Sequence, residues 1–206
     1  MVAGPKTFFT KQEYAALENA AEHKSEYING QIYAMSGGSR DHARIGGDAF
    51  ASLHAQLRNK ACEPLNCDMR IDVLDTGATF YPDVSVACPP LELAPDDEYA
   101  LTNPVVLIEV LSPSTETNDR ISKWSHYQRI PSLRDYVLVA QDKIRIEHYA
   151  RRDDNSWILH IVENIDGFIT LDSIECRLNI AEVYERVTFP AAKNELHPGA
   201  IDHANL

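Results

Sequence analysis

The chain has 206 residues, 44% of them hydrophobic and 24% charged, a balance typical of one globular domain with a substantial core. Its 31 acidic and 19 basic residues give a formal net charge of −12, which argues against a broad DNA-binding face because an acidic surface repels phosphate. A local basic groove, or an acidic site shielded by a divalent metal, is compatible with this charge. No apolar run approaches the roughly 20 residues that span a bilayer, and the start has no apolar signal segment. We therefore expect a cytoplasmic protein without membrane contact.

The four cysteines lead to the same expectation about location. None of them belongs to a CxxC pair, and they are Cys62, Cys67, Cys88 and Cys176. Without a secretory signal, this pattern predicts reduced and mostly buried thiols, as is usual in the cytosol.

Local signals define the N-terminal third of the chain. Thr10 and Glu13 have the spacing of a capping box, which predicts that a helix begins there. Two aromatic-rich segments of alternating polarity flank Asn29-Gly30, the preferred pair of a tight turn, and predict a β-hairpin over residues 24–35. From residue 41 to about residue 60, apolar side chains recur at helical spacing and predict a second helix.

The other elements follow from alternation, turn residues and prolines. Strands are predicted at 66–73, 79–88, 104–111, 135–139, 143–150, 156–163 and 168–171, helices at 117–129 and 178–186, and a solvated acidic loop at 92–98. Residues 1–9 are predicted to be a flexible lead-in and residues 189–206 a polar tail. The sequence therefore predicts an α/β or α+β fold with a mixed sheet flanked by helices, in a single domain of residues 10–188.

Two acidic residues stand out against their surroundings. Glu109 lies inside the β-branched, proline-bounded strand 104–111, which is predicted to be buried on both faces, and an ionised carboxylate there is costly unless it is paired. Asp83 follows Pro82 and opens an apolar alternation. If the two strands are neighbours, both acids converge and provide hard oxygen ligands for Mg²⁺ or Mn²⁺. The alternatives are a turn or edge position for Asp83 and a structural salt bridge for Glu109.

The helix that follows this strand offers a third partner. Asp119, Lys123 and Tyr127 are spaced i, i+4, i+8, so they share one helical face. If that face packs near the end of the strand, the Lys123 ammonium reaches Glu109 or a substrate phosphate. The alternative is an ordinary solvated helix lysine.

Several segments together resemble the Uma2 family of restriction-endonuclease-like proteins. They are Glu26-Tyr27-Ile28-Asn29-Gly30, Ser39-x-x-His42, Tyr81-Pro82-Asp83-Val84, Ile108-Glu109-Val110-Leu111-Ser112-Pro113-Ser114-Thr115 and Asp119-Arg120-x-x-Lys123-x-x-x-Tyr127. The resemblance extends from about residue 10 to residue 186, and its most specific part is 108–127. It implies the PD-(D/E)xK nuclease fold, with a core of helix, three strands, helix and strand between residues 41 and 140.

The resemblance also implies roles for individual residues. Asp83 corresponds to the central metal ligand and Glu109 to the second acid, while the backbone carbonyl of Val110 completes the metal shell. The lysine of the motif is expected two residues after the acid, where this chain has Leu111. Lys123 is its natural substitute, presented from the following helix.

Two further residues have secondary roles under this resemblance. Glu26 adds an outer carboxylate, and His42 faces a phosphate or caps its helix. The implied function is Mg²⁺- or Mn²⁺-dependent hydrolysis of DNA phosphodiester bonds by a homodimeric endonuclease. A basic groove for DNA would draw on Arg40, Arg44, Arg58, Arg120, Lys123 and Arg129.

Two alternatives stay open beside this function. The acidity and the missing motif lysine favour a catalytically inactive nuclease-fold protein that acts in binding or assembly, whereas Asp83, Glu109 and Lys123 favour an enzyme. A nuclease that acts on RNA or on a branched nucleic acid is equally compatible with the sequence.

Overall fold

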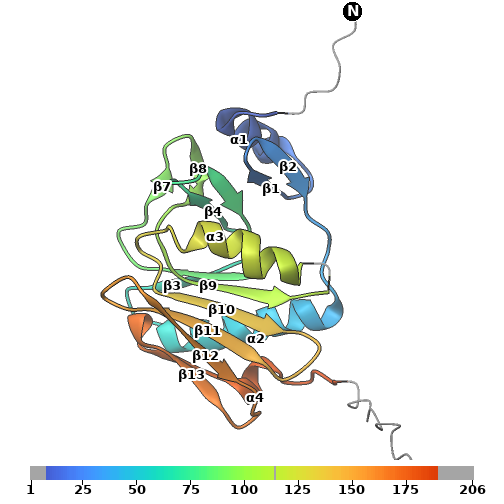
Figure 1. Ribbon diagram of the computed structural model, residues 1–206, viewed down its shortest axis with the longest axis vertical. Coiled ribbons are helices and arrows are strands. Elements are labelled where there is room, and N and C mark those ends of the chain that lie inside the picture. Colours follow the sequence, from blue (N-terminus) through green and yellow to red (C-terminus); the bar gives the residue numbers. More distant parts are fainter. Residues whose placement is uncertain (1–7, 114, 190–206) are drawn as a thin grey trace, which may run out of the picture.

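The computed structural model describes residues 8–113 and 115–189 (Figure 1). The predicted lead-in and tail therefore lie outside the described residues, except for residues 8, 9 and 189. Within the described part, the backbone N–H of Phe9 donates a hydrogen bond to the carbonyl of Gly30 over 2.8 Å, and the Phe189 ring packs against Tyr184. No helix in this part has the length and apolar character needed to cross a bilayer.

Most strands belong to two six-stranded mixed sheets, and a two-stranded sheet completes the fold. The first sheet contains, in spatial order, β12 (Trp157–Val162), β11 (Ile146–Arg151), β10 (Asp135–Ala140), β9 (Pro104–Leu111), β6 (Val84–Ala87) and β3 (Glu63–Asn66). The second contains β2 (Gln31–Ala34), β1 (Ser25–Ile28), β5 (Ala78–Phe80), β4 (Arg70–Val73), β8 (Asp97–Leu101) and β7 (Leu93–Ala94). The small sheet pairs β13 (Phe168–Leu171) with β14 (Cys176–Asn179). The α+β class predicted from the sequence is confirmed, but with two large sheets in place of one.

Helices cover both faces of the first sheet (Figure 1). One face is covered by α2 (Arg40–Leu57), and the other by a π-helical segment (Asn118–Lys123) that continues into α3 (Trp124–Tyr127). The helix α1 (Lys11–Ala20) contacts β1 of the second sheet, and a 3-10 turn (Asp172–Ile174) and α4 (Ile180–Val183) complete the helical elements of the described residues. The capping box predicted at the start of α1 is present, with Thr10 and Glu13 as its two partners.

Strand β9 lies in the middle of the first sheet, as its apolar sequence predicts. It pairs antiparallel with β6 and parallel with β10. Its side chains alternate between two buried clusters: Ile108 packs with residues of α2 on one face, and Leu107 packs with Tyr127 of α3 on the other. The expectation that this strand is buried on both faces is therefore confirmed, and it places Glu109 between two layers of packed side chains.

Two predicted strands are each broken in the structure. The predicted strand 66–73 becomes β3 and β4, which belong to different sheets, and 79–88 becomes β5 and β6. The second break falls at Pro82, which has no N–H to donate to a strand ladder. The chain thus leaves one sheet and enters the other at residues 81–83. This crossing carries Asp83 to the junction of the two sheets.

The loop predicted at 92–98 and the helix predicted at 178–186 also differ from the structure. The acidic stretch contributes to β7 and β8, where Asp97 is buried in an ion pair with Arg70. The C-terminal segment is divided between β14 and the single turn α4. In both segments, contacts with distant parts of the chain outweigh the local pattern.

The expectation of four reduced thiols is wrong for two of the cysteines. Cys62 and Cys88 form a disulfide, whereas Cys67 and Cys176 are free. Cys62 immediately precedes Glu63 and Cys88 immediately follows Ala87, and Glu63 pairs with Ala87 at the end of the antiparallel β3–β6 ladder. The two cysteines are therefore the next residues to face each other. The cytoplasmic location stays a prediction.

Reduction of this disulfide is expected to lower the free energy of unfolding by about 3–4 kcal/mol, because the bond closes a loop of 26 residues in the unfolded chain. Urea unfolding with and without reductant measures the loss. The double variant Cys62→Ser/Cys88→Ser serves as the control: it should match the reduced parent and show no response to reductant. Equal stability of the oxidised and reduced parent would contradict a role for the bond in folding.

Candidate active site

Asp83 and Glu109 meet because their strands are direct neighbours. Val84 of β6 pairs with Ile108 of β9, so Asp83, one residue earlier, lies beside Glu109 and Val110. One oxygen of the Asp83 carboxylate accepts a hydrogen bond from the Val110 N–H at 2.7 Å. Both acids line the same cavity of about 280 Å³, as the neighbouring strands predict.

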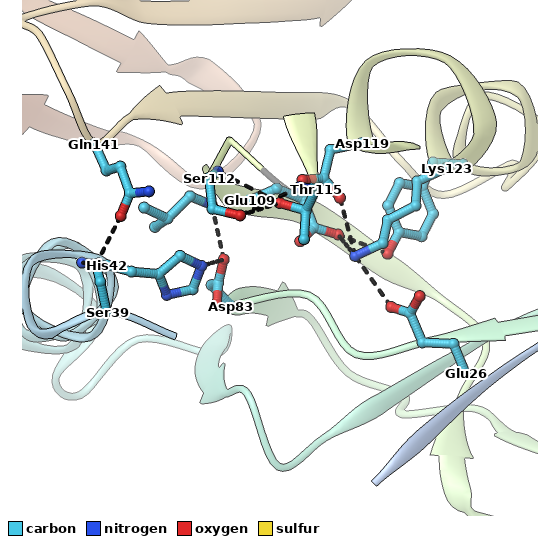
Figure 2. A network of polar contacts seen from close by, with 12 residues as sticks. Glu26, Ser39, His42, Asp83, Glu109, Ser112, Thr115, Asp119, Lys123 and Gln141 are labelled. Atoms are coloured by element: carbon cyan, nitrogen blue, oxygen red, sulfur yellow. Dashed lines mark hydrogen bonds and ion pairs between the residues drawn. The ribbon is translucent and has the colours of Figure 1, made fainter. Parts of the chain in front are cut away.

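His42 approaches Asp83 from the first turn of α2. Ser39 caps this helix, because its hydroxyl accepts the His42 N–H at 3.1 Å. The imidazole Nε2 then lies 3.4 Å from Asp83 Oδ2 (Figure 2). Ser39 also donates to Gln141, which follows β10, over 2.8 Å. The helix start is thereby tied to the sheet on the same side of the cavity.

Lys123 lies at the centre of the site and is not a solvated helix lysine. Its ammonium is 3.0 Å from Glu109 Oε1, 3.1 Å from Glu26 Oε1 and 3.2 Å from Asp119 Oδ1 (Figure 2). The residue is 5% exposed. Since Glu26 belongs to β1 of the second sheet and Glu109 to β9 of the first, this one cation joins the two sheets.

A tyrosine completes the surroundings of Glu109. The Tyr127 hydroxyl donates to Glu109 Oε1 at 3.0 Å, on the same oxygen that accepts from Lys123. In contrast, Glu26 Oε1 and Asp119 Oδ1 accept no hydrogen bond from the described residues, although both lie at ion-pair distance from the ammonium. Two of the three carboxylates around Lys123 therefore have a buried oxygen that is in an ion pair but accepts no hydrogen bond.

The site contains more negative than positive charge. Three carboxylates, of Glu26, Glu109 and Asp119, surround the single ammonium of Lys123, and a fourth, of Asp83, lines the same cavity beside His42. Removing charges from water is costly, so excess buried charge must be balanced by protons or by a cation. The donor set of several carboxylates is the one that hard divalent cations prefer.

The excess of negative charge and the burial of these groups shift their pKa values. Burial raises the pKa of Glu109 well above its ordinary value, although Lys123 opposes the rise. Burial also raises the pKa of Asp83, against the influence of His42 and the Val110 N–H. Burial disfavours the charged form of Lys123, but the carboxylates outweigh it and raise the pKa of the ammonium. Lys123 is thus held as a cation, while Asp83 and Glu109 hold protons more readily than ordinary carboxyls.

No three side chains of His, Cys, Asp or Glu within residues 8–113 and 115–189 are already arranged as a metal site. The Lys123 ammonium instead fills the space among Glu26, Glu109 and Asp119. Val110 lines the cavity, and its N–H holds Asp83.

The basic groove expected for DNA is weakened by ion pairs. Arg120 binds Glu147 and Glu116, and Arg129 lies 2.9 Å from Asp75. With Lys123 buried among carboxylates, three of the six expected cations are committed to acids of the same chain.

The sequence interpretation missed two members of the site. Their spacing places Asp119 and Tyr127 on the face of Lys123 but predicts no role for either. The signal was present, because three polar side chains on one helical face next to a buried acid form a polar network more readily than a packing surface. Ser39 stands out in the sequence only within the Ser39-x-x-His42 segment, and nothing local indicates its bond to Gln141, 102 residues later.

Comparison with known proteins agrees with this fold. The profile of the Uma2 family, described as "Putative restriction endonuclease", matches residues 11–181. Two uncharacterised proteins of Synechocystis sp., slr1290 and sll1609, are 34% and 33% identical to the chain, over 91% and 77% of its length and 97% and 90% of theirs.

A solved structure shares the fold. The crystal structure of "a putative nuclease belonging to DUF820" from Anabaena variabilis superposes with a TM-score of 0.70, at 18% identity, over 85% of this chain and 97% of that one. This likeness confirms the nuclease-like fold. The profile match over residues 11–181, together with the two similar sequences of Synechocystis sp., shows that the chain belongs to the Uma2 family.

Proposed function

We propose that the chain is a metal-dependent endonuclease whose active site is the cavity between Asp83, Glu109 and Lys123. The observation that carries the proposal is the charge of this site, where three buried carboxylates contact one ammonium and the partly buried carboxylate of Asp83 lines the same cavity. A divalent cation, Mg²⁺ or Mn²⁺, balances this charge and matches the oxygen donors. The family and the nuclease-like fold support the same reaction.

The side chains have distinct parts in the proposed hydrolysis. A bound divalent ion supplies polarisation of the scissile phosphate and a more acidic water. Asp83 and Glu109 hold the ion, with the Val110 carbonyl as a further ligand. Lys123 orients the attacking water or stabilises the negative charge that develops on the phosphate. Glu26 restrains Lys123 from the second sheet, and His42 restrains Asp83.

DNA is the proposed substrate, and a second candidate function is an inactive nuclease-fold protein that binds or assembles with a partner. One observation favours this second candidate: Lys123 is fully engaged by carboxylates, and two of the arginines expected to meet phosphate are paired with acids. The two candidates differ in whether metal addition leads to strand cleavage.

Nicking of supercoiled plasmid tests the proposal. The parent is expected to nick DNA with Mg²⁺ or Mn²⁺ and not with a chelator. Asp83→Asn and Glu109→Gln are each expected to lower the rate by about 10²-fold or more, since each removes a charge that stabilises the reacting complex. Asp166→Asn, at an exposed acid in another loop, is the matched control and should retain the parental rate.

The outcomes separate the candidates. Cleavage that survives both substitutions would show that this site does not carry out the reaction. Cleavage of RNA or of a branched substrate, but not of plasmid, would keep the site and change the substrate. A parent that binds Mn²⁺ and cleaves none of the three substrates would favour the binding protein.

A further inference from the structure

Strand β12 forms an open edge of the first sheet. It pairs antiparallel with β11 on one side, from Trp157 opposite Arg151 to Val162 opposite Ile146. On its other side, no strand of the described chain pairs with it. An open edge presents a row of unpaired N–H and C=O groups that can form a ladder with a further strand.

The composition of β12 is unusual for such an edge. Its six residues read Trp-Ile-Leu-His-Ile-Val and include no acidic residue, lysine, arginine, proline or glycine. Ile158, Leu159 and Ile161 are 37%, 44% and 46% exposed. Natural proteins usually protect an exposed edge with charges, prolines or bulges, and β12 has none of these inside the strand. Its exposed apolar side chains are continued by Ile165 and Phe168 just beyond it.

The other edges of the described sheets are shorter than β12 or carry charges or proline, and β13 and β14 of the small sheet have only four residues each. The opposite edge of the first sheet, β3, contains Pro64 and begins with Glu63, next to the disulfide at Cys62. The edges of the second sheet are β2, with four residues, and β7, with two. On a second copy of the chain, the strand that best matches β12 in length and apolar character is therefore β12 itself.

We propose that two copies of the chain associate through antiparallel pairing of their β12 strands, which joins two six-stranded sheets into one continuous sheet. A two-fold axis perpendicular to the sheet keeps the same face upward in both copies, so directly opposed residues must point to the same face. The pairing centred on His160 then sets Ile158 opposite Val162 of the partner subunit and Leu159 opposite Ile161 of the partner subunit. All exposed apolar side chains of the strand meet apolar side chains, and no like charges are opposed within it.

Repulsion between the two acidic copies should make this association depend on salt. Each copy carries a formal net charge of −12, so the copies repel each other, and salt screens this repulsion. The backbone ladder and the apolar contacts are not weakened by screening. Dimerisation through β12 is therefore expected to strengthen with added NaCl. The proposal does not depend on nuclease activity, because β12 contributes no residue to the cavity around Glu109.

Sedimentation velocity of the parent chain across a wide range of concentration tests the association. The parent is expected to form dimers, and Ile161→Lys, which places a charge on the edge, is expected to raise the dissociation constant by about tenfold or more. Ile121→Lys is the matched control, because Ile121 is an exposed isoleucine of the π-helical segment. It should dimerise like the parent. A monomeric parent at all concentrations, or equal dimerisation of both variants, would overturn the proposal.

A cysteine cross-link tests the register without relying on a disruptive variant. In a Cys67→Ser background, which removes the exposed free thiol, His160→Cys is expected to form an intersubunit disulfide, because opposed strand residues meet the distance that the bond needs. Ile121→Cys should stay monomeric on a non-reducing gel. A cross-link with Leu159→Cys and not with His160→Cys would support pairing of this edge in the register centred one residue earlier. The absence of both cross-links would contradict the proposal.

Discussion

Lys123→Met is expected to lower the free energy of unfolding by about 3–5 kcal/mol, the usual cost of removing one partner from a buried ion pair. The substitution keeps most of the volume of the side chain and deletes only the ammonium. It leaves Glu26, Glu109 and Asp119 facing one another in a buried space, without the cation now about 3 Å from each. Chemical denaturation at neutral pH without metal measures the loss.

Two comparisons show whether the loss comes from the deleted charge. Lys143→Met, at an exposed lysine of the turn after β10, is expected to change stability by no more than about 0.5 kcal/mol. Mn²⁺ is expected to restore part of the stability of Lys123→Met, because a divalent ion then replaces the ammonium among the carboxylates. If Lys123→Met were as stable as the parent at neutral pH, the carboxylates would have to be protonated already, and the proposed charge balance would be wrong.

The core of the site could be predicted because its signals are local. Glu109 is conspicuous as one charge in an apolar strand, and the i, i+4, i+8 spacing of the next helix places Lys123 on a defined face. Each signal depends on strand or helix periodicity, which a short stretch of sequence reveals. Their convergence required one further assumption, that the strands of Asp83 and Glu109 are neighbours, and the pairing of β6 with β9 confirms it.

The features that could not be predicted depend on contacts between distant residues. The break at Pro82 is visible in the sequence. Which sheet β5 and β6 each join depends instead on the strands with which they pair, and those include strands that lie far away in the chain, such as β1 for β5. The disulfide of Cys62 with Cys88 follows from the register of β3 and β6, which no spacing rule provides. The approach of Glu26 to Lys123 likewise requires the second sheet to pack beside the first.

Glu109 and Glu147 can be compared directly in a pH experiment, because their side chains are similarly buried but folding shifts their pKa values in opposite directions. They are 3% and 4% exposed. Burial raises the pKa of Glu109 well above its ordinary value. For Glu147, burial acts in the same direction, but hydrogen bonds from Arg120 and Arg145 outweigh it and lower the pKa.

The two glutamates should therefore contribute to stability with opposite dependence on pH. A carboxyl whose pKa is raised by folding contributes stability below its ordinary pKa, and this contribution is lost as the pH rises through the raised value. A carboxyl whose pKa is lowered contributes stability above its ordinary pKa, and loses it as the pH falls through the lowered value. The effect of Glu109 thus belongs to the range above about pH 4.5, and that of Glu147 to the range below it.

Glu109→Gln is expected to make the metal-free protein more stable than the parent at neutral pH, and to flatten the decline in stability as the pH rises. The amide oxygen can still accept hydrogen bonds from Lys123 and Tyr127, while the costly charge is absent. Glu147→Gln is expected to lose about 2 kcal/mol at neutral pH, because it weakens charged hydrogen bonds to two arginines, and to flatten the acid side of the profile. Urea unfolding across pH measures both effects.

Divalent metal should stabilise the parent and Glu147→Gln increasingly as the pH rises, since ion binding requires deprotonated carboxylates, and should have little effect on Glu109→Gln. Metal stabilisation of Glu109→Gln equal to that of the parent would show that Glu109 does not hold the ion, whatever the nuclease assay reports.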